Sequence, residues 1–304
     1  MSTTATVSTT ASVVNQTSPL VMRIIGACAL AHLINDLIQA VLPSIYPMLK
    51  ANYGLSFAQV GLITLTFQLT ASLLQPWVGY HTDRHPKPWL LPAGMVCTLI
   101  GIMMLAFVGS FGAILLASAL VGIGSSTFHP ETSRVARLAS GGRYGLAQST
   151  FQVGGNAGSA FGPLLAAAIV IPFGQGHVAW FGLFAVFAIF VQYGLSRWYR
   201  NHLNLFKLKQ GGKATHGLSK ARVTAALVVL ALLVFSKYFY MASLTSYFTF
   251  YLIEKFHLSV TSSQVYLFLF LGAVAAGTFF GGPIGDKIGR KKVIWFSILG
   301  VAPF

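Results

Sequence analysis

Long apolar runs alternate with short charged loops along most of this chain, and this alternation limits its fold more than any other feature. Only 8% of the 304 residues are charged, against about a quarter in an ordinary soluble domain. About 20 apolar residues form one helical crossing of a bilayer. The sequence therefore predicts an all-α membrane protein, with crossings near residues 21–48, 59–80, 89–109, 112–138, 145–171, 177–199, 223–253 and 260–283, and a ninth that begins near 293.

The positive charge of the chain is confined to alternate loops. Sixteen of the 20 Lys and Arg residues lie in 84–87, 134–143, 197–222 and 287–292. Loops rich in Lys and Arg stay on the cytoplasmic side of a membrane. The net charge of +15 is therefore explained by topology with a cytoplasmic amino terminus, and nucleic-acid binding is not indicated.

The residues that usually hold metals or perform covalent chemistry are sparse. Cys28 and Cys97 lie in separate apolar runs, where a free thiol behaves as a small hydrophobic group. We expect no disulfide, no metal and no other cofactor. A membrane enzyme would have to rely on His129 and Glu131, and a receptor or scaffold is the other alternative to a transporter.

A short motif occurs twice, with an offset of 203 residues. The first copy contains Gly79, Asp83 and Arg84, and the second contains Gly282 and Asp286, followed by Lys287 and Arg290. An Asp at a helix end can cap the next helix or pair with Arg, and a Gly allows two helices to approach closely. The motif predicts a latch that changes with conformation, although an ordinary basic loop that anchors the helices is the alternative.

The repeat also predicts how the chain is organised. Two similar halves of six helices each are typical of transporters that alternate access about a central site. We expect a disordered cytoplasmic tail (1–20), a first half (21–199), a basic cytoplasmic linker (200–222) and part of a second half (223–304). Residue 304 would correspond to residue 101 of the first half, which predicts that about 100 residues of a complete second half are missing.

The second motif copy, from Gly282 to Lys291, resembles the signature of the major facilitator superfamily. The stretches 31–36, 128–131, 151–156 and 235–241 are similar to antibiotic exporters of that family. The resemblance implies the major facilitator fold, truncated here after about eight and a half helices, in the bacterial inner membrane. It also implies export of a small fosmidomycin-like phosphonate by proton antiport, and we expect the protein to be a monomer. An uptake symporter for an organic anion or sugar is the alternative.

One acid lies well inside the first predicted helix. Asp36 has His32, Asn35 and Gln39 at helical spacings that place all four on one polar stripe. An ionisable group inside a membrane helix is costly and is therefore a functional candidate. We expect Asp36, with His32, to carry protons, and Asn35 and Gln39 to contact substrate. The alternative is a permanent polar contact that only holds helices together.

Three further charged residues lie on helices that line the central cavity in the superfamily. Glu131 and Arg134 are three residues apart and can form an ion pair that gates the inner side, or an ordinary interfacial pair. By resemblance, Glu131 is a second candidate for proton coupling. Lys237 lies within a predicted span beside Tyr240, and we expect both to contact an anionic substrate. The alternatives for Lys237 are a pair with an acid such as Asp36 and a wrongly placed span boundary.

Small residues recur on one face of the fifth predicted helix. Gly154, Gly158 and Gly162 are spaced by four residues, and Pro163 follows. This spacing predicts close packing against a neighbouring helix. The stretch also resembles the antiporter motif of the superfamily. By contrast, Pro86 and Lys87 depart from its loop signature, and Ser118 stands where many drug antiporters have an Arg.

Overall fold

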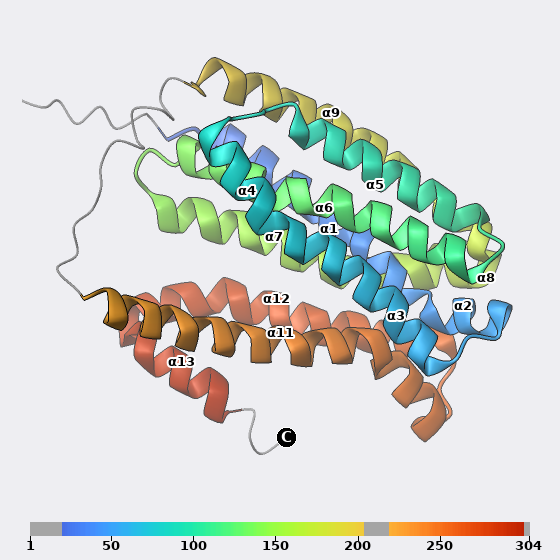
Figure 1. The fold of residues 1–304 in the computed structure, drawn as a ribbon. Helices are drawn as coiled ribbons and strands as arrows, with labels where there is room; N and C mark the ends of the chain where they lie inside the picture. The colour runs from blue at the N-terminus through green and yellow to red at the C-terminus, as the bar shows by residue number, and fades with distance from the viewer. Residues whose placement is uncertain (1–19, 204–218, 301–304) are drawn as a thin grey trace, which may run out of the picture.

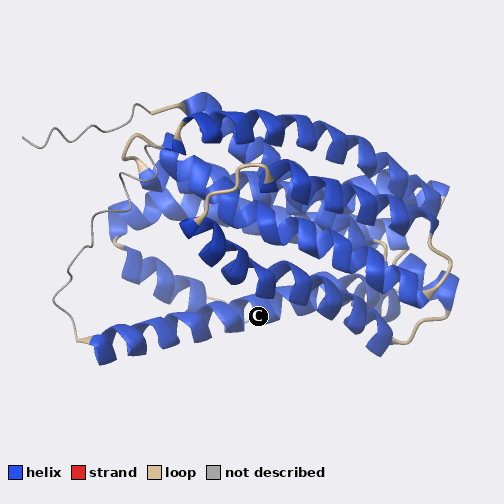
Figure 2. Ribbon diagram, turned by 45° about the horizontal axis from the view of Figure 1, so that its top comes forward, coloured by secondary structure: helices blue, strands red, loops and turns tan. Residues whose placement is uncertain are grey.

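The computed structural model describes residues 20–203 and 219–300, apart from the side chains of residues 282, 283, 285–287 and 290. Every regular element in these residues is a helix (Figure 2). Eight helical segments are long and apolar enough to cross a membrane. The predictions of an all-α fold and of eight crossing helices are therefore confirmed. The tail and most of the linker lie outside the described residues.

The helices follow one another in an up-and-down order (Figure 1). The first half contains α1 (Met22–Ser44), α2 (Tyr46–Tyr53), α3 (Phe57–Gln68), the π-helix η1 (Leu69–Leu73), α4 (Leu74–Arg84), α5 (Leu90–Phe107), α6 (Phe111–Ala139), α7 (Tyr144–Leu165), the π-helix η2 (Ala166–Val170), α8 (Ile171–Phe173), the 3-10 helix η3 (Gln175–Trp180) and α9 (Phe181–Asn201). The second part contains α11 (Lys220–Phe256), α12 (Val260–Ile288) and α13 (Arg290–Leu299).

Several boundaries differ from the predicted ones. The first crossing continues through α2 to Tyr53 instead of ending at 48, and Pro43 lies inside α1 just before the junction between the two helices. The π-helices η1 and η2 interrupt the second and fifth crossings. Pro163 lies one turn before η2 and cannot donate a backbone hydrogen bond, which helps the helix to change its winding there. The ninth helix begins at Arg290 rather than near 293.

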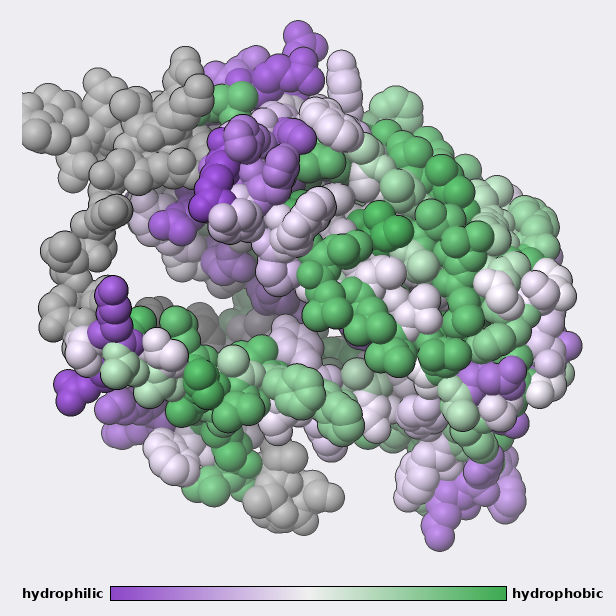
Figure 3. Space-filling model, viewed as in Figure 1, coloured by the Kyte–Doolittle hydropathy of each residue, from purple (hydrophilic) through white to green (hydrophobic). Residues whose placement is uncertain are grey.

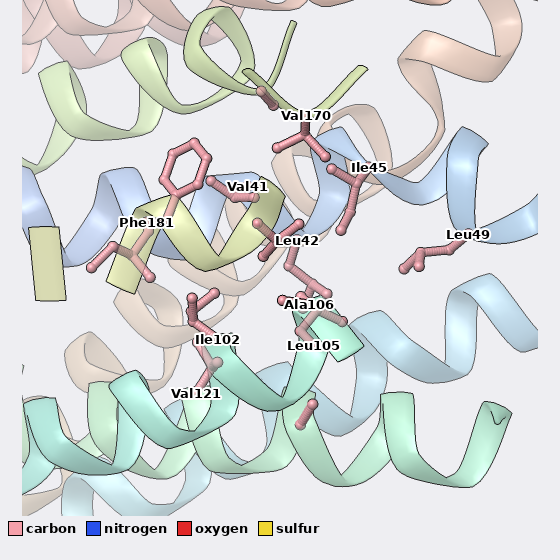
Figure 4. Packing of buried hydrophobic residues seen from close by; sticks show 14 of the residues in the cluster. Val41, Leu42, Ile45, Leu49, Ile102, Leu105, Ala106, Val121, Val170 and Phe181 are labelled. Atoms are coloured by element: carbon pink, nitrogen blue, oxygen red, sulfur yellow. The ribbon is translucent and has the colours of Figure 1, made fainter. Parts of the chain in front are cut away.

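The main apolar core lies inside the first half. Figure 4 shows side chains of this core from α1, α5, α6, η2 and α9, among them Val41, Leu42, Ile102, Val121, Val170 and Phe181. Because lipid is as apolar as these side chains, close van der Waals packing is what stabilises the contacts. On the outside, apolar residues cover much of the flank, whereas hydrophilic residues gather toward the two ends (Figure 3).

The glycines of α7 lie against α1. A Cβ atom added at Gly158 would overlap the backbone carbonyl of Leu33, and one at Gly162 would lie 2.5 Å from the Cβ of Ala40. These positions have no room for a side chain, as the predicted seam requires. Gly79 differs, because a Cβ there would lie 3.7 Å from Pro130, which is an ordinary contact.

The two halves meet at one end of the molecule and separate at the other (Figure 1). We call the end that carries the basic loops, with Lys87 and Arg143, the basic end, and the opposite end the far end. Near the far end, Gln264 donates a hydrogen bond of 2.7 Å to the carbonyl of Ser44, and Thr64 lies 3.1 Å from Ser246. In α11, residues 220–222 and 224–240 are exposed. A hollow between the halves opens toward the basic end (Figure 3).

Candidate functional site

Three titratable side chains meet between α1 and α6. Nε2 of His32 lies 3.3 Å from one carboxylate oxygen of Asp36, and Nε2 of His129 lies 3.7 Å from the other. The amide of Asn35 donates a 3.0 Å hydrogen bond to the same carboxylate. His32 is buried, whereas the side chains of Asp36 and His129 are 19% and 28% exposed. We call His32, Asp36 and His129 the carboxylate–histidine cluster.

The second nitrogen of each imidazole contacts a backbone carbonyl. Nδ1 of His32 lies 2.8 Å from the oxygen of Phe151, and Nδ1 of His129 lies 3.2 Å from that of Ser125. A carbonyl oxygen can only accept, so this network assigns the proton to Nδ1 in both rings. Both Nε2 atoms then face Asp36, and a proton on Nε2 or on the carboxylate is needed to make the contact attractive. One proton in the cluster could therefore be shared between an imidazole and the carboxylate.

Helix α7 also packs against the cluster, which lies between α1 and α6. The ring of Phe151 stacks on His32 with 4.0 Å between the ring centroids. Gly155 lies directly over the cluster, because a Cβ added there would overlap the imidazole of His32 and lie 2.8 Å from Oδ2 of Asp36. The close approach of α1 and α7 therefore limits how far the His32 ring can turn away from the carboxylate.

The cluster is also the group of side chains, within the described residues, that could hold a metal ion. Its three ligand atoms lie within 4.8 Å of one another. However, 3.3 Å and 3.7 Å are separations of direct imidazole–carboxylate pairs, and a shared proton is sufficient to explain them. That this site uses no metal stays a prediction.

The predicted polar stripe continues along α1 from the cluster. Oε1 of Gln39 accepts a hydrogen bond of 3.3 Å from Ser125, which also lies one turn before His129 on α6. Asn35 and Gln39 each keep one buried polar atom without a hydrogen-bond partner, Oδ1 and Nε2 respectively. These two atoms are available to a polar ligand or to water.

A separate charge network lies nearer the basic end. Arg134 forms ion pairs of 2.5 Å with Asp83 and with Glu131, and it donates a 3.1 Å hydrogen bond to Thr82. Glu131 is fully buried, whereas the Asp83 side chain is 61% exposed. The sequence predicted that Asp83 either caps the next helix or pairs with Arg, and in this structure it pairs with Arg134. We call Asp83, Glu131 and Arg134 the latch.

Other predicted site residues contact neither group through the interactions described here. Arg84 stacks over the ring of Tyr80, with 3.7 Å from Cζ to the ring centroid. Lys237 and Tyr240 are exposed on α11. In this structure the Asp36 carboxylate contacts the two histidines and not Lys237.

The second copy of the latch motif is described in its backbone alone. Gly282 and Asp286 fall within α12, and α13 begins at Arg290. Their side chains lie outside the described residues. Between the two helices stands Gly289 with φ of 97°, a conformation that glycine adopts without strain.

A cavity that the sequence analysis missed lies beside the cluster. Its volume is about 450 Å³, and its polar lining consists of Ser72, Gln75, His129, Ser133, Gln148 and Gln152. These residues come from η1, α4, α6 and α7. The available signal was the i,i+4 spacing of Gln148 and Gln152 on a predicted membrane helix, because polar side chains within membrane helices tend to face cavities.

The chain resembles transporters in sequence and in structure. The model of the Major Facilitator Superfamily matches residues 28–304. The Fosmidomycin resistance protein of Escherichia coli (strain K12) is 60% identical over 281 residues, which are 92% of this chain and 69% of that protein. The Uncharacterized MFS-type transporter YfnC of Bacillus subtilis (strain 168) is 40% identical over 286 residues, which are 93% of this chain and 69% of that protein.

Solved structures support the fold. A bacterial homologue of the human lysosomal transporter Spinster, in an inward-facing and unoccupied conformation, has a TM-score of 0.66 and 18% sequence identity. The match covers 90% of this chain and 64% of that one. The same homologue in an occupied conformation has a TM-score of 0.64 and 17% identity. The chain therefore spans about two thirds of the length of the proteins that it matches.

Proposed function

Because this chain belongs to the Major Facilitator Superfamily, a family of membrane transporters, we propose that it exports a small anionic phosphonate of the fosmidomycin class from the bacterial cytoplasm. The observation that carries the substrate class is the 60% identity, over 92% of the chain, to a protein named for fosmidomycin resistance. The chain is a multi-pass membrane protein of a transporter family and not an enzyme.

The transport cycle is alternating access between two openings. The hollow at the basic end supports an opening on the side that holds the Lys and Arg loops. By the positive-inside rule this side is the cytoplasm, with the amino terminus on the same side of the inner membrane. In this state the far end is closed, and the latch lies within the first half near the open basic end.

The cycle exchanges protons for substrate. The carboxylate–histidine cluster supports this proposal, because the Nε2 atoms of two imidazoles face the Asp36 carboxylate at distances at which a proton can be shared. His32 is the partner predicted from the sequence, and His129 joins it in the structure. Glu131 remains a second candidate for coupling, although its contact is with Arg134. Asn35, Gln39, Lys237 and Tyr240 are the proposed substrate contacts.

The energetics favour export of an anion. With the cell interior negative, moving one negative charge outward gains about 2.3 kcal/mol per 100 mV. An inward proton contributes about the same amount, plus about 1.4 kcal/mol for each unit of pH difference. The outward movement of one anionic charge and the inward movement of one proton together sustain an outside-to-inside ratio of substrate concentration of at least about a hundredfold.

The test measures labelled fosmidomycin in bacteria that express the protein, with and without a protonophore. We expect low accumulation in these cells, which rises when the protonophore collapses the proton gradient. Asp36→Asn should raise accumulation to the level of cells without the protein. Glu254→Gln is the matched control, because Glu254 is an exposed residue at the far end of α11 and its change to an amide should leave export intact.

Two results would contradict this proposal. Accumulation equal to that of cells without the protein would remove the substrate assignment. Higher accumulation that falls with the protonophore would favour the uptake symporter. A third measurement separates the coupling from the substrate, because antiport requires proton release when fosmidomycin binds to the purified protein in weakly buffered detergent solution, whereas symport requires proton uptake.

A further inference from the structure

The cavity of about 450 Å³ between η1, α4, α6 and α7 has the size of a small-molecule site. It lies entirely within the first half, on the side of the carboxylate–histidine cluster that faces the basic end, and none of the substrate contacts proposed from the sequence lines it. His129 is shared, because its ring forms part of the cavity wall and its Nε2 faces Asp36.

We propose that this cavity binds the phosphonate group of the exported substrate. Five of its six polar lining side chains are hydroxyls or amides, which can donate hydrogen bonds. Both nitrogens of the sixth, His129, are already in contact with Ser125 and Asp36. None of the described residues that line it carries a carboxylate, and the Asp36 carboxylate lies behind His129, 3.7 Å from its Nε2. The proposal rests on the proposed function and assigns a place to the substrate's charged group.

The hydrogen bonds around the cavity leave donors for such a ligand. Ser133 donates a 3.3 Å hydrogen bond to Oε1 of Gln148. This bond uses only the oxygen of the Gln148 amide. The two N–H groups of the amide nitrogen take no part in it and can donate to a ligand. Gln148 is exposed and Gln152 is partly buried, as expected for side chains at the mouth and on the wall of a site that a ligand must enter and leave. A phosphonate oxygen accepts hydrogen bonds from groups of this kind.

A chain of hydrogen bonds connects the cavity to the second half. The amide of Gln152 donates to Oδ1 of Asn156 at 3.3 Å, and the amide of Asn156 donates to the hydroxyl of Thr278 on α12 at 2.8 Å. A ligand that draws the Gln152 amide into the cavity therefore competes with the first bond of this chain. Binding in the first half is in this way transmitted to the contact between the halves.

The surroundings of the cavity favour an anion that arrives from the basic end. Lys87 and Arg143 lie in described loops at that end, and positive charge there raises the local concentration of anions. Ser72 belongs to the π-helix η1, and local π-turns occur frequently at functional sites of helices. The wall itself uses largely uncharged donors, which allow the weak binding that a transporter needs for release.

The test measures binding of labelled fosmidomycin to the purified full-length protein in detergent. Gln148→Glu replaces amide donors with a negative charge at nearly the same volume, and we expect the Kd to rise by about tenfold or more. Gln148→Leu removes the donors alone and should raise the Kd by about fivefold. The matched control is Ser149→Glu, which puts the same charge one residue further along α7, where the side chain does not line the cavity, and should change the Kd by less than about twofold.

Competition by simple ligands identifies the chemical group that is recognised. Methylphosphonate and inorganic phosphate should displace labelled fosmidomycin from the wild-type protein, and displacement should weaken in Gln148→Glu, whereas neutral acetamide should not compete. If wild type binds and exports fosmidomycin but Gln148→Glu and Gln148→Leu bind it with unchanged Kd, the cavity assignment is wrong and the proposed function stands. If the wild-type protein neither binds nor exports fosmidomycin, both proposals fail.

Discussion

Replacing Gly158 by alanine should destabilise the protein, although alanine is the better helix former. Gly158 lies in α7 where it crosses α1, and an added methyl group would overlap the carbonyl of Leu33 and lie 2.9 Å from the backbone nitrogen of Leu37. Both are backbone atoms, which cannot rotate away as a flexible side chain can. The two helices must therefore move apart.

The size of the effect follows from two opposing contributions. Overpacking costs about 1–3 kcal/mol, and the upper end applies here because the obstacle is backbone. Alanine in place of glycine in a helix gains about 1 kcal/mol. The net loss at Gly158 is then about 2 kcal/mol. Gly26 on α1 has nothing within 4 Å of an added Cβ, so Gly26→Ala should gain about 1 kcal/mol.

The assay is thermal melting of the purified variants in one detergent, followed by the loss of the monodisperse peak in size-exclusion chromatography. The difference of about 3 kcal/mol should separate Gly158→Ala from Gly26→Ala by about 6 °C, at about 2 °C per kcal/mol for a chain of this size. Gly79→Ala should melt close to Gly26→Ala, because its added methyl meets Pro130 at 3.7 Å. Equal melting temperatures for Gly158→Ala and Gly26→Ala would refute the steric reasoning.

Two further predictions concern the latch and the far end. Arg134→Gln should lower the free energy of unfolding by about 3 kcal/mol, because it leaves the fully buried Glu131 without its ion pair. Arg137→Gln, at an exposed position, should melt at the wild-type temperature. Equal melting temperatures for the two variants would contradict the latch. Thr64→Val removes the hydroxyl that contacts the second half, and spin-label distances across the far end should broaden. Thr66→Val is its control, since that hydroxyl bonds within its own helix, and identical distance distributions would argue against the closure described here.

The crossing helices could be predicted well because hydropathy is a local property of the chain. A run of about 20 apolar residues predicts a crossing without any knowledge of the helices that pack around it. The predicted and observed ends differ by a few residues, and most at α2, where the first crossing runs on to Tyr53. The π-helices η1 and η2 could not be predicted, since a π-turn depends on packing as well as on sequence.

The candidate site was predictable only as far as one helix extends. His32, Asn35 and Asp36 share α1, so helical periodicity was sufficient to place them together. His129 is 93 residues from Asp36 in the sequence and reaches it only because α6 packs beside α1. Predicting the cavity likewise requires knowing which helices pack together, since Gln75 and Gln148 come from different helices.

The distribution of charge between and within the halves affects how they move. Among the described residues, the ion pairs lie inside the first half, whereas the side-chain bonds that join it to α11 and α12 are neutral. A neutral hydrogen bond contributes about 1 kcal/mol and is little affected by dissolved salt. The first half can therefore behave as a stiff body whose separation from the second proceeds by exchanging single weak bonds, with a rate that we expect to be nearly independent of ionic strength.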